Sequence, residues 1–343
     1  MSRNRQSGGI LRILIELLVL AALPAAWAWH RYTAFTESPI VLPPADEHVL
    51  SVEPGDGFLA VLAKLRRAGV TQGSDLEWKV LATEMGVAKR VQVGDYSLDG
   101  PLTVRSLLRK LGEGDVIQQR FTLIEGWSFR TVREALAANT QLEPETAGLS
   151  DAEIMQRLGR EGVHPEGRFL PETYLFARGS SDLDILRRAA EAMDEALAEA
   201  WAGREPDPKI DSADKLLTLA SIVEKETGLA SERPRIAGVF LRRLEIGMLL
   251  QTDPTVIYGM GEGYDGNIRK RDLQADTPYN TYTRAGLPPT PIAMPGRAAL
   301  EAVAHPQRGD ELYFVASGGG AHHFSATLAE HNAAVDKYQR KRR

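Results

Sequence analysis

The stretch LLTLASIVEKETG, Leu216 to Gly228, begins as an apolar run and ends in a charged triplet. Its apolar residues fall on one face of a helix, and this periodicity extends over residues 213–226. Glu224 and Glu226 lie on opposite borders of that face, roughly 70 to 90 degrees from its centre at ~100 degrees per residue. Either glutamate can therefore reach a buried pocket, with a slight preference for Glu226, or both are solvated. A carboxyl in a partly apolar cleft has a raised pKa, which suits a general acid.

Further helices and strands are expected on both sides of this helix. Residues 118–124 predict a strand, followed by a helix with Ser128 as its N-cap. Helical periodicity returns over residues 183–201 and 232–244, and two strands around a glycine turn precede a closing helix over 327–340. Residues 247–295 are instead rich in Gly, Pro, Thr, Tyr and Asn. Compact domains seldom keep such a long loop-rich region without a functional reason.

Upstream, residues 48–117 predict a separate small module. A strand over 49–52 and a turn precede an amphipathic helix over 58–67, and a second helix is expected over 75–85. A further strand leads to a helix over 103–111 that ends at Gly112. A length of 343 residues allows about two domains at ~150 residues each. Both parts of the chain therefore favour an α+β fold class.

The chain opens with the apolar segment 10–30, close to the ~20 residues that a transmembrane helix needs. Arg12 and Glu16 interrupt it near its start, while Trp27 and Trp29 stand where an interfacial aromatic belt is expected. Arginines before the segment predict a cytoplasmic N-terminus and an exported body. A cleaved signal peptide is the alternative, because residues 26–28 have the small-x-small form of a cleavage site.

Composition excludes several kinds of chemistry. The net charge is -5 with dispersed basic residues, so nucleic acid is not an expected partner. The absence of cysteine excludes disulfides, thiol nucleophiles and thiolate metal sites. The glycine-rich run YGMGEGYDG lacks the Gly-Lys-Ser/Thr of a phosphate loop, and no metal site is expected from the histidines, which lack ligand spacing. These are His305, His322, His323 and His331.

An ordered series of motifs in the second half of the chain resembles one known family. The segments are ASIVEKETGLASERPRIAGVFLRRLEIGMLLQTDPTVIYGMGEGYDG, TPYNTYTRAGLPPTPIAMPG, AHPQRGDELYFVA and HHFSATLAEHN, with a looser match upstream that includes EGRFLPETYLF. Together they resemble the YceG-like (MltG) family of membrane-anchored endolytic murein transglycosylases. The resemblance implies a cytoplasmic tail over 1–9, a transmembrane helix over 10–30, a linker over 31–47, a LysM-like module over 48–117 and a catalytic domain over 118–343.

The resemblance also implies a catalytic residue and a reaction. The family's catalytic glutamate aligns with the second acid of the EKE triplet, Glu226, with Glu224 as the fallback. A lytic transglycosylase can use one glutamate, which protonates the glycosidic oxygen and then accepts a proton from the muramoyl C6 hydroxyl. That hydroxyl closes onto C1 to give a 1,6-anhydro end, and its intramolecular position replaces an attacking water. No metal or cofactor is required.

The loop-rich region supplies candidate sugar-binding side chains. Hydrogen-bonding groups and flat aromatic faces occur together there, as in carbohydrate clefts. Asp253 matters most, because a second carboxylate near the anomeric carbon would favour hydrolysis, which uses a pair of carboxylates. The candidates are Gln251, Thr252, Asp253, Tyr258, Tyr279, Asn280, Thr281 and Tyr282.

Two functions of different classes follow from these patterns. The first is an endolytic transglycosylase at the inner (cytoplasmic) membrane, with its catalytic domain in the periplasm and nascent peptidoglycan strands as substrate. Such an enzyme is expected to set glycan length near the peptidoglycan synthases. The second is a non-catalytic peptidoglycan-binding scaffold of the synthesis machinery, favoured by the glycan-binding appearance of the first module.

Overall fold

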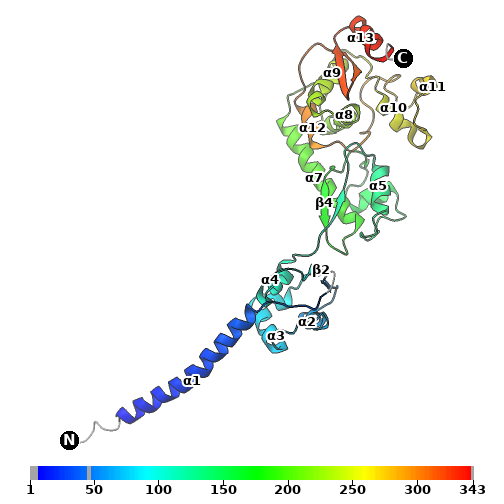
Figure 1. The fold of residues 1–343 in the computed structure, drawn as a ribbon. Coiled ribbons are helices and arrows are strands. Elements are labelled where there is room, and N and C mark those ends of the chain that lie inside the picture. Colours follow the sequence, from blue (N-terminus) through cyan, green and yellow to red (C-terminus); the bar gives the residue numbers. More distant parts are fainter. Residues whose placement is uncertain (1–6, 45–47, 341–343) are drawn as a thin grey trace. The chain divides into compact units, whose positions relative to one another are not determined.

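The computed structural model describes residues 7–44 and 48–340, and the side chains of residues 7–14 also lie outside the description. The chain forms two compact units, one of residues 1–119 and 177–179 and the other of residues 120–176 and 180–343. Both units combine helices with short sheets, which confirms the predicted α+β class (Figure 1). Most of the predicted cytoplasmic tail and the end of the predicted linker fall outside the described residues.

The first helix, α1 (Ser7–Thr36), contains the predicted span 10–30. Its apolar side chains from Ile15 to Trp29 are exposed, and Leu18 keeps 71% of its surface accessible. Within residues 7–44 and 48–340, no helix combines the length and the apolar character that crossing a membrane requires. The end of α1 packs on its own unit, where Arg31 Nε lies 3.2 Å from Glu77 and Phe35 meets Trp78 edge-on.

The rest of the first unit is a small sheet covered by helices. β1 (Val49–Val52) pairs antiparallel with β2 (Gly94–Ser97), and α2 (Phe58–Arg67), α3 (Asp75–Glu84), η1 (Val87–Lys89) and α4 (Val104–Glu113) pack around buried apolar side chains. The helix predicted over 58–67 has the observed bounds. α4 begins and ends later than predicted, because Thr103 is its N-cap and the left-handed Gly114, not Gly112, is its C-cap.

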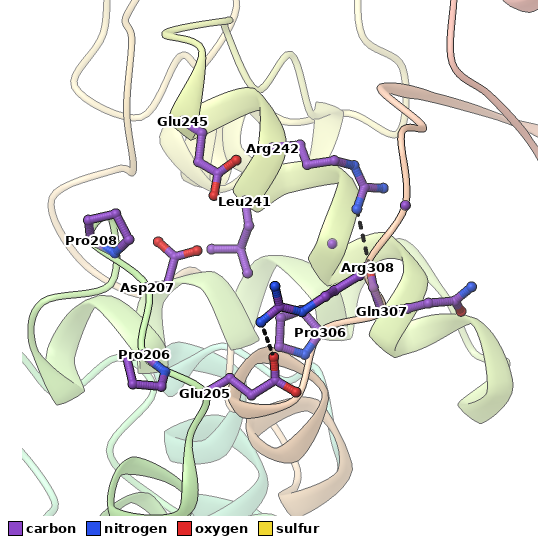
Figure 2. Close-up of a pocket in the computed structure, with 12 residues that line it drawn as sticks. Glu205, Pro206, Asp207, Pro208, Leu241, Arg242, Glu245, Pro306, Gln307 and Arg308 are labelled. Atoms are coloured by element: carbon purple, nitrogen blue, oxygen red, sulfur yellow. Dashed lines mark hydrogen bonds and ion pairs between the residues drawn. The ribbon is translucent and has the colours of Figure 1, made fainter.

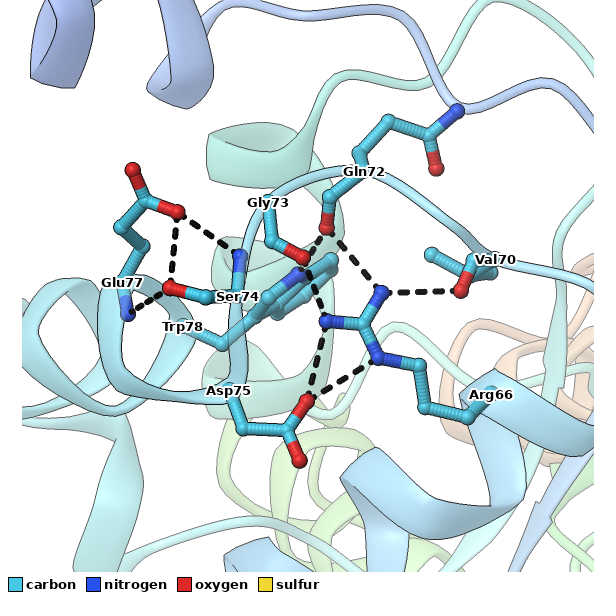
Figure 3. A network of polar contacts seen from close by, with 8 residues as sticks. All are labelled: Arg66, Val70, Gln72, Gly73, Ser74, Asp75, Glu77 and Trp78. Atoms are coloured by element: carbon cyan, nitrogen blue, oxygen red, sulfur yellow. Dashed lines mark hydrogen bonds and ion pairs between the residues drawn. The ribbon is translucent and has the colours of Figure 1, made fainter.

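One arginine ties α2 to α3 in this unit. The Arg66 guanidinium donates to the carbonyl oxygens of Val70, Gln72 and Gly73 and to Asp75 at distances from 2.7 to 3.1 Å (Figure 3). The buried Trp78 donates its indole N–H to the Gln72 carbonyl at 2.7 Å. These carbonyls lie in a turn outside any helix or sheet, and here side chains serve as their hydrogen-bond donors. Arg66 therefore fixes the α2 to α3 turn by its hydrogen bonds.

The second unit begins with a mixed part. β3 (Gln119–Thr122) pairs with β4 (Thr173–Phe176), and α5 (Phe129–Ala137) starts at the predicted N-cap Ser128, whose side chain accepts the Thr131 N–H. α6 (Asp151–Arg157) lies between these strands in sequence. Their apolar side chains share one core with the first half of the long α7 (Asp182–Gly203). Strand β4 was not predicted.

A bundle of helices forms the larger core of this unit. α8 (Ala213–Glu226) has the predicted bounds, and its residues 216, 217, 219, 220, 222 and 223 are completely buried. α9 (Arg233–Glu245), which follows the short η2 (Ala230–Glu232), α12 (Arg297–Ala304) and the end of α7 pack against it (Figure 1). α8 is thus an inner helix over residues 216–223, and only its first and last turns reach solvent or a cavity.

The region predicted to be mostly loop contains short helices. These are α10 (Asp253–Met260), η3 (Gly261–Gly263) and α11 (Lys270–Gln274). Asp253-Pro254 starts α10, and proline suits the first helical turn, where its missing N–H costs no hydrogen bond. The predicted hairpin is confirmed as β5 (Tyr313–Gly318) and β6 (Ala321–Ser325), antiparallel. The predicted closing helix divides into α13 (Leu328–Val335) and the π-helical η4 (Asp336–Arg340).

Gly238 provides a test of how tightly α9 is packed. A Cβ at this position would overlap the Gln307 carbonyl oxygen, which also accepts Arg242 Nη1 at 3.1 Å. Gly to Ala in an exposed helix normally stabilises by about 1 kcal/mol. We expect Gly238→Ala instead to lower the unfolding free energy by about 1 to 3 kcal/mol, as overpacking does, in a urea titration.

The matched control is Gly203→Ala in α7, where the nearest atom to a new Cβ would be 3.9 Å away on His305. This control is expected to leave the unfolding free energy unchanged or slightly higher. Equal effects of the two substitutions would contradict the close approach at Gly238.

Candidate active site

An open cavity of about 510 Å³ lies where the end of α8 meets the hairpin and the closing helices. Polar and aromatic side chains dominate its walls, as expected for a site that takes a hydrated, sugar-like ligand. Four of the predicted binding residues and the predicted catalytic glutamate line it. The lining side chains include Glu226, Arg243, Gln251, Thr252, Asp253, Tyr282, Tyr313, Phe314, His322 and His331.

Glu226, the last residue of α8, lies half-buried at this cavity. Its Oε1 accepts a short hydrogen bond from the hydroxyl of the buried Thr252. Burial raises the pKa of Glu226, and the nearby Asp253 charge raises it further, while the Thr252 hydrogen bond and the charges of His322 and Arg243 oppose this. A carboxyl whose pKa is raised by burial keeps its proton more readily near neutral pH, as a general acid must.

Glu224, on the opposite border of the apolar face, has a different environment. Its side chain is only 5% exposed, its Oε1 lies 3.2 Å from the Arg233 guanidinium, and its Oε2 accepts the Gly296 N–H at 3.0 Å. Burial raises the pKa of Glu224, whereas these two contacts favour its charged form. Both oxygens are therefore occupied by protein groups that join α8 to α9 and α12, and Glu224 is not among the cavity residues.

The segment after Leu250 forms one rim of the cavity. Gln251 has φ of +49°, in the left-handed region that few residues other than glycine adopt. Its backbone N–H donates to the Thr281 carbonyl at 3.1 Å, and the next N–H, of Thr252, donates to Thr281 Oγ1 at 3.1 Å. On the same rim, Tyr282 Oη donates to Asp253 Oδ1 at 2.5 Å, and burial raises the Tyr282 pKa. The strained turn thus presents Thr252 to Glu226.

Two other predicted binding residues support this rim from behind. Asn280 is almost fully buried and donates to the carbonyl oxygens of residues 272, 273 and 275. Thr281 is also buried, and its hydroxyl bonds Thr255 at 2.9 Å in addition to the Thr252 N–H. Neither lines the cavity, so the structure assigns both to the loop's own hydrogen bonding.

The predicted tyrosines Tyr258 and Tyr279 lie together, away from the cavity. Their rings meet edge-on with centroids 4.9 Å apart, both pack against the helical core, and Tyr279 Oη is 2.8 Å from Thr290 Oγ1. Burial raises the pKa of Tyr258. The structure brings Gln251, Thr252, Asp253 and Tyr282 to Glu226, and it does not bring these two tyrosines there.

Several cavity residues were missed from sequence. The buried Arg243 of α9 donates to the carbonyl oxygens of residues 250 and 312, and its charge lies near Glu226. His322 of β6 and His331 of α13 also line the walls, and His331 stacks on Tyr313. From the sequence, the spacing of these histidines indicates neither a metal site nor another role. Over residues 7–44 and 48–340, no group of His, Cys, Asp and Glu is arranged to hold a metal ion.

A second cavity of about 400 Å³ lies between α9 and the loops around residues 205–208 and 306–309 (Figure 2). Arg308 pairs with Glu205 at 3.0 Å, and Arg242 donates to the Gln307 carbonyl, so both arginines that line this cavity are engaged by protein groups. None of the residues predicted to act in catalysis or binding lines it. The Glu226 cavity is therefore the candidate active site.

Glu166, from the motif EGRFLPETYLF, is a buried carboxyl outside the candidate active site. It is 3% exposed and accepts the Phe129 N–H, at the start of α5, at 3.0 Å. Burial raises its pKa to about 7. In the unfolded chain the ordinary value near 4.5 applies, so the folded state holds this proton more tightly.

Folding stability is therefore expected to fall as the pH rises from the unfolded pKa of Glu166 to its folded pKa. A Glu166 pKa of 4.5 in the unfolded chain and about 7 in the folded one lowers the unfolding free energy by about 3 kcal/mol between pH 4 and pH 8. The side chain in Glu166→Gln cannot ionise, so this variant should not show that loss of unfolding free energy. Urea unfolding of both proteins at the two pH values measures the difference, and an unchanged pH dependence in the variant would refute the assignment.

These features define a class: an α+β protein with a half-buried glutamate at a helix end, facing an open polar cavity as a candidate acid. The chain belongs to the YceG-like family, whose family model matches residues 50–337. It is 32% identical over 306 residues to an endolytic murein transglycosylase of Bacillus subtilis (strain 168), covering 84% of each chain.

Two further relatives support the family assignment. The chain is 25% identical over 347 residues to an endolytic murein transglycosylase of Streptococcus pneumoniae serotype 2, covering 88% of this chain and 60% of that one. A crystal structure of a YceG-like protein from Listeria monocytogenes superposes with a TM-score of 0.51 at 27% identity, covering 84% of this chain and 99% of that one.

Proposed function

We propose that this protein is an endolytic murein transglycosylase, a lyase that cleaves bonds between N-acetylmuramic acid and N-acetylglucosamine within nascent peptidoglycan strands. Its relatives carry that activity in their names. The observation that carries the proposal is the environment of Glu226, whose burial raises its pKa while one of its oxygens is held by Thr252 at an open cavity. A neutral acid in such a place can protonate a leaving oxygen.

The reaction proceeds with one carboxyl group. Glu226 donates its proton to the glycosidic oxygen, and the C1 to O4 bond breaks. The muramoyl C6 hydroxyl gives its proton to a base in the site, in the simplest case the Glu226 carboxylate, and its oxygen bonds to C1. This regenerates the acid, consumes no water and leaves a 1,6-anhydro end that terminates the strand. Because the nucleophile belongs to the substrate, its attack avoids the entropy cost of a second molecule.

Asp253 favours a second candidate, a hydrolase, because its carboxylate shares the cavity with Glu226. Glycosidases use two carboxylates, one as acid and one as base or nucleophile. Against this role, Asp253 accepts the Tyr282 hydroxyl at 2.5 Å. Incubating the protein with uncrosslinked glycan and weighing the products separates the two. Anhydro-muramic ends support the transglycosylase, and reducing ends would establish the hydrolase.

The proposal includes a single-pass anchor in the inner membrane, with residues 1–9 in the cytoplasm and the LysM-like module and catalytic domain in the periplasm. It is supported by the arginines before the apolar segment and by the exposed apolar side chains of α1. The full chain is expected to stay with membranes in alkaline carbonate, and a variant lacking residues 1–30 to be released. Release of the full chain would refute the anchor. Near the membrane, the enzyme would work beside peptidoglycan synthases.

The pH dependence of cleavage tests whether Glu226 is the acid. The rate is expected to fall as the pH rises through the Glu226 pKa, because only the protonated form donates. Thr252→Val removes a hydrogen bond that favours the carboxylate, so this fall should move to higher pH. Asp253→Asn removes a negative neighbour, so the fall should move to lower pH. Rates across a pH series measure both, and shifts in the same direction would contradict the assignment.

A further inference from the structure

His322 is held at the active-site cavity by a carboxylate. Its Nδ1 lies 2.8 Å from Glu232 Oε2, and its backbone N–H donates to Glu232 Oε1 at 2.9 Å. Glu232 follows α8 closely in sequence, and Thr227, the residue after Glu226, donates its hydroxyl to Glu232 Oε2 at 3.4 Å. The end of the catalytic helix and the His322 ring are therefore anchored on the same carboxylate.

The Glu232 contact determines which nitrogen of His322 carries the proton. The contacts with His322 lower the pKa of Glu232, which keeps it ionised and able only to accept hydrogen bonds. Nδ1 must then carry a hydrogen, and in the neutral ring Nε2 has the lone pair. Phe314 and Phe324 confine the ring edge-on, with centroids 5.5 and 6.5 Å away.

Nε2 of His322, which lines the cavity, is accessible. Within the described residues, Nε2 accepts no hydrogen bond, whereas Nδ1 is bonded to Glu232. Nε2 is not among the buried polar atoms without a partner, so part of its surface is accessible. His322 itself lines the cavity wall. The charged and titratable side chains that share the cavity with His322 are Glu226, Arg243, Asp253, Tyr282, Tyr313 and His331.

The hydrogen bond on Glu226 explains why a second proton acceptor is useful. Because Oε1 of Glu226 accepts the Thr252 hydroxyl, only Oε2 lacks a hydrogen bond within the described part of the chain. With Glu226 as both acid and base, this one oxygen would have to reach the leaving oxygen first and the C6 hydroxyl next. Two groups placed separately can serve two separate substrate oxygens without such a movement.

We propose that His322 is a second catalytic residue, which accepts the proton of the muramoyl C6 hydroxyl at Nε2 while Glu226 protonates the leaving oxygen. This rests on the proposed transglycosylase function. The O6–H proton passes to Nε2, an O6 electron pair forms the bond to C1, and the C1 to O4 bond breaks with its electrons on O4, which takes the Glu226 proton. The proton on His322 then returns to the Glu226 carboxylate, so both groups are restored. Glu232 is the positioning residue.

The test uses the full chain, uncrosslinked glycan and single-turnover rates over a pH series. His322→Gln is expected to lower the rate about 100-fold, the lower end of what a general base contributes. Wild-type rates should fall at both acid and alkaline pH, and His322→Gln should lose the acid-side fall, because no histidine must then be unprotonated. Glu232→Gln should lower the rate about tenfold or more while leaving the affinity for the glycan unchanged, a split that loss of packing at the cavity would not cause.

The matched control is His323→Gln. His323 is the next residue of β6, exposed on the other face of the strand and outside the cavity, so its replacement should leave the rate unchanged. Thermal melting establishes whether each variant is folded. If His322→Gln does not fold, Glu232→Gln tests the proposal independently.

The outcomes separate this inference from the function on which it rests. If His322→Gln still produces anhydro ends, at a rate within threefold of the wild-type rate, the role of His322 is overturned and the transglycosylase function stands. A slow variant that keeps the acid-side fall would overturn the base role. Reducing ends from the wild-type protein would overturn both the inference and the transglycosylase.

Discussion

Glu226→Gln is expected to lower the rate of glycan cleavage by about 10³-fold, within the range that a positioned general acid contributes. Glutamine has no acidic proton to donate, yet its amide oxygen can still accept the Thr252 hydroxyl that bonds Glu226 Oε1. The cavity and the fold should therefore persist. Mass spectrometry of products from uncrosslinked glycan measures the remaining anhydro ends, and thermal melting verifies that the variant is folded.

Glu224→Gln is the matched control for this loss of activity. It makes the same chemical change two residues away, at a carboxylate bonded to Arg233 and Gly296. Folded Glu224→Gln protein should cleave at the wild-type rate. If Glu224→Gln lost cleavage and Glu226→Gln kept it, Glu224 would be the acid, and the proposed transglycosylase function would be unchanged. A Glu226→Gln variant that lacks cleavage but keeps its full cellular role would favour the non-catalytic scaffold.

Glu224→Ala is expected to have the largest effect on stability, lowering the unfolding free energy by about 3 to 5 kcal/mol, as breaking a buried ion pair does. Arg233 and Glu224 are only 10% and 5% exposed. Without Glu224, the one carboxylate still beside the Arg233 charge in the described part of the chain is that of Glu125, which is 3.6 Å away and half exposed. The Gly296 N–H at the start of α12 also loses its acceptor. Urea unfolding of the full chain measures the loss.

The double variant Glu224→Leu with Arg233→Met tests the cause of this loss. It removes both charges together and fills the space with apolar side chains, which is often nearly neutral for buried pairs. It should therefore be markedly more stable than Glu224→Ala. A double variant as unstable as the single one would show that packing around α8, rather than the uncompensated Arg233 charge, sets the cost.

Local patterns predicted the regular elements of the fold well. The helices over 58–67 and 213–226 occur at the predicted bounds, and the hairpin of β5 and β6 lies where glycines divide two short strands. The helices α10 and α11 were missed within a region rich in turn residues, since eight- and five-residue helices show too little periodicity. α12 was missed for the same reason, because it is also only eight residues long.

The candidate site was predictable only in part. The family motifs directed attention to the EKE triplet and to the segment around Gln251. They did not distinguish side chains that face a cavity from those that hold its walls, such as Asn280 and Thr281. The contribution of Glu232 and His322 was also invisible, because these two residues are 90 positions apart and meet only through folding.

By itself, the sequence determined the α+β class, the helix over 213–226 with its one apolar face, and the two border glutamates, because helical periodicity depends only on local geometry. The tertiary structure alone decided how those glutamates differ. Arg233 and Gly296 occupy both oxygens of Glu224, whereas Thr252 takes one oxygen of Glu226 and leaves the other at an open cavity. The physical reason is that burial and hydrogen-bond partners, which set a carboxyl's pKa and its access to a ligand, come from segments distant in the chain.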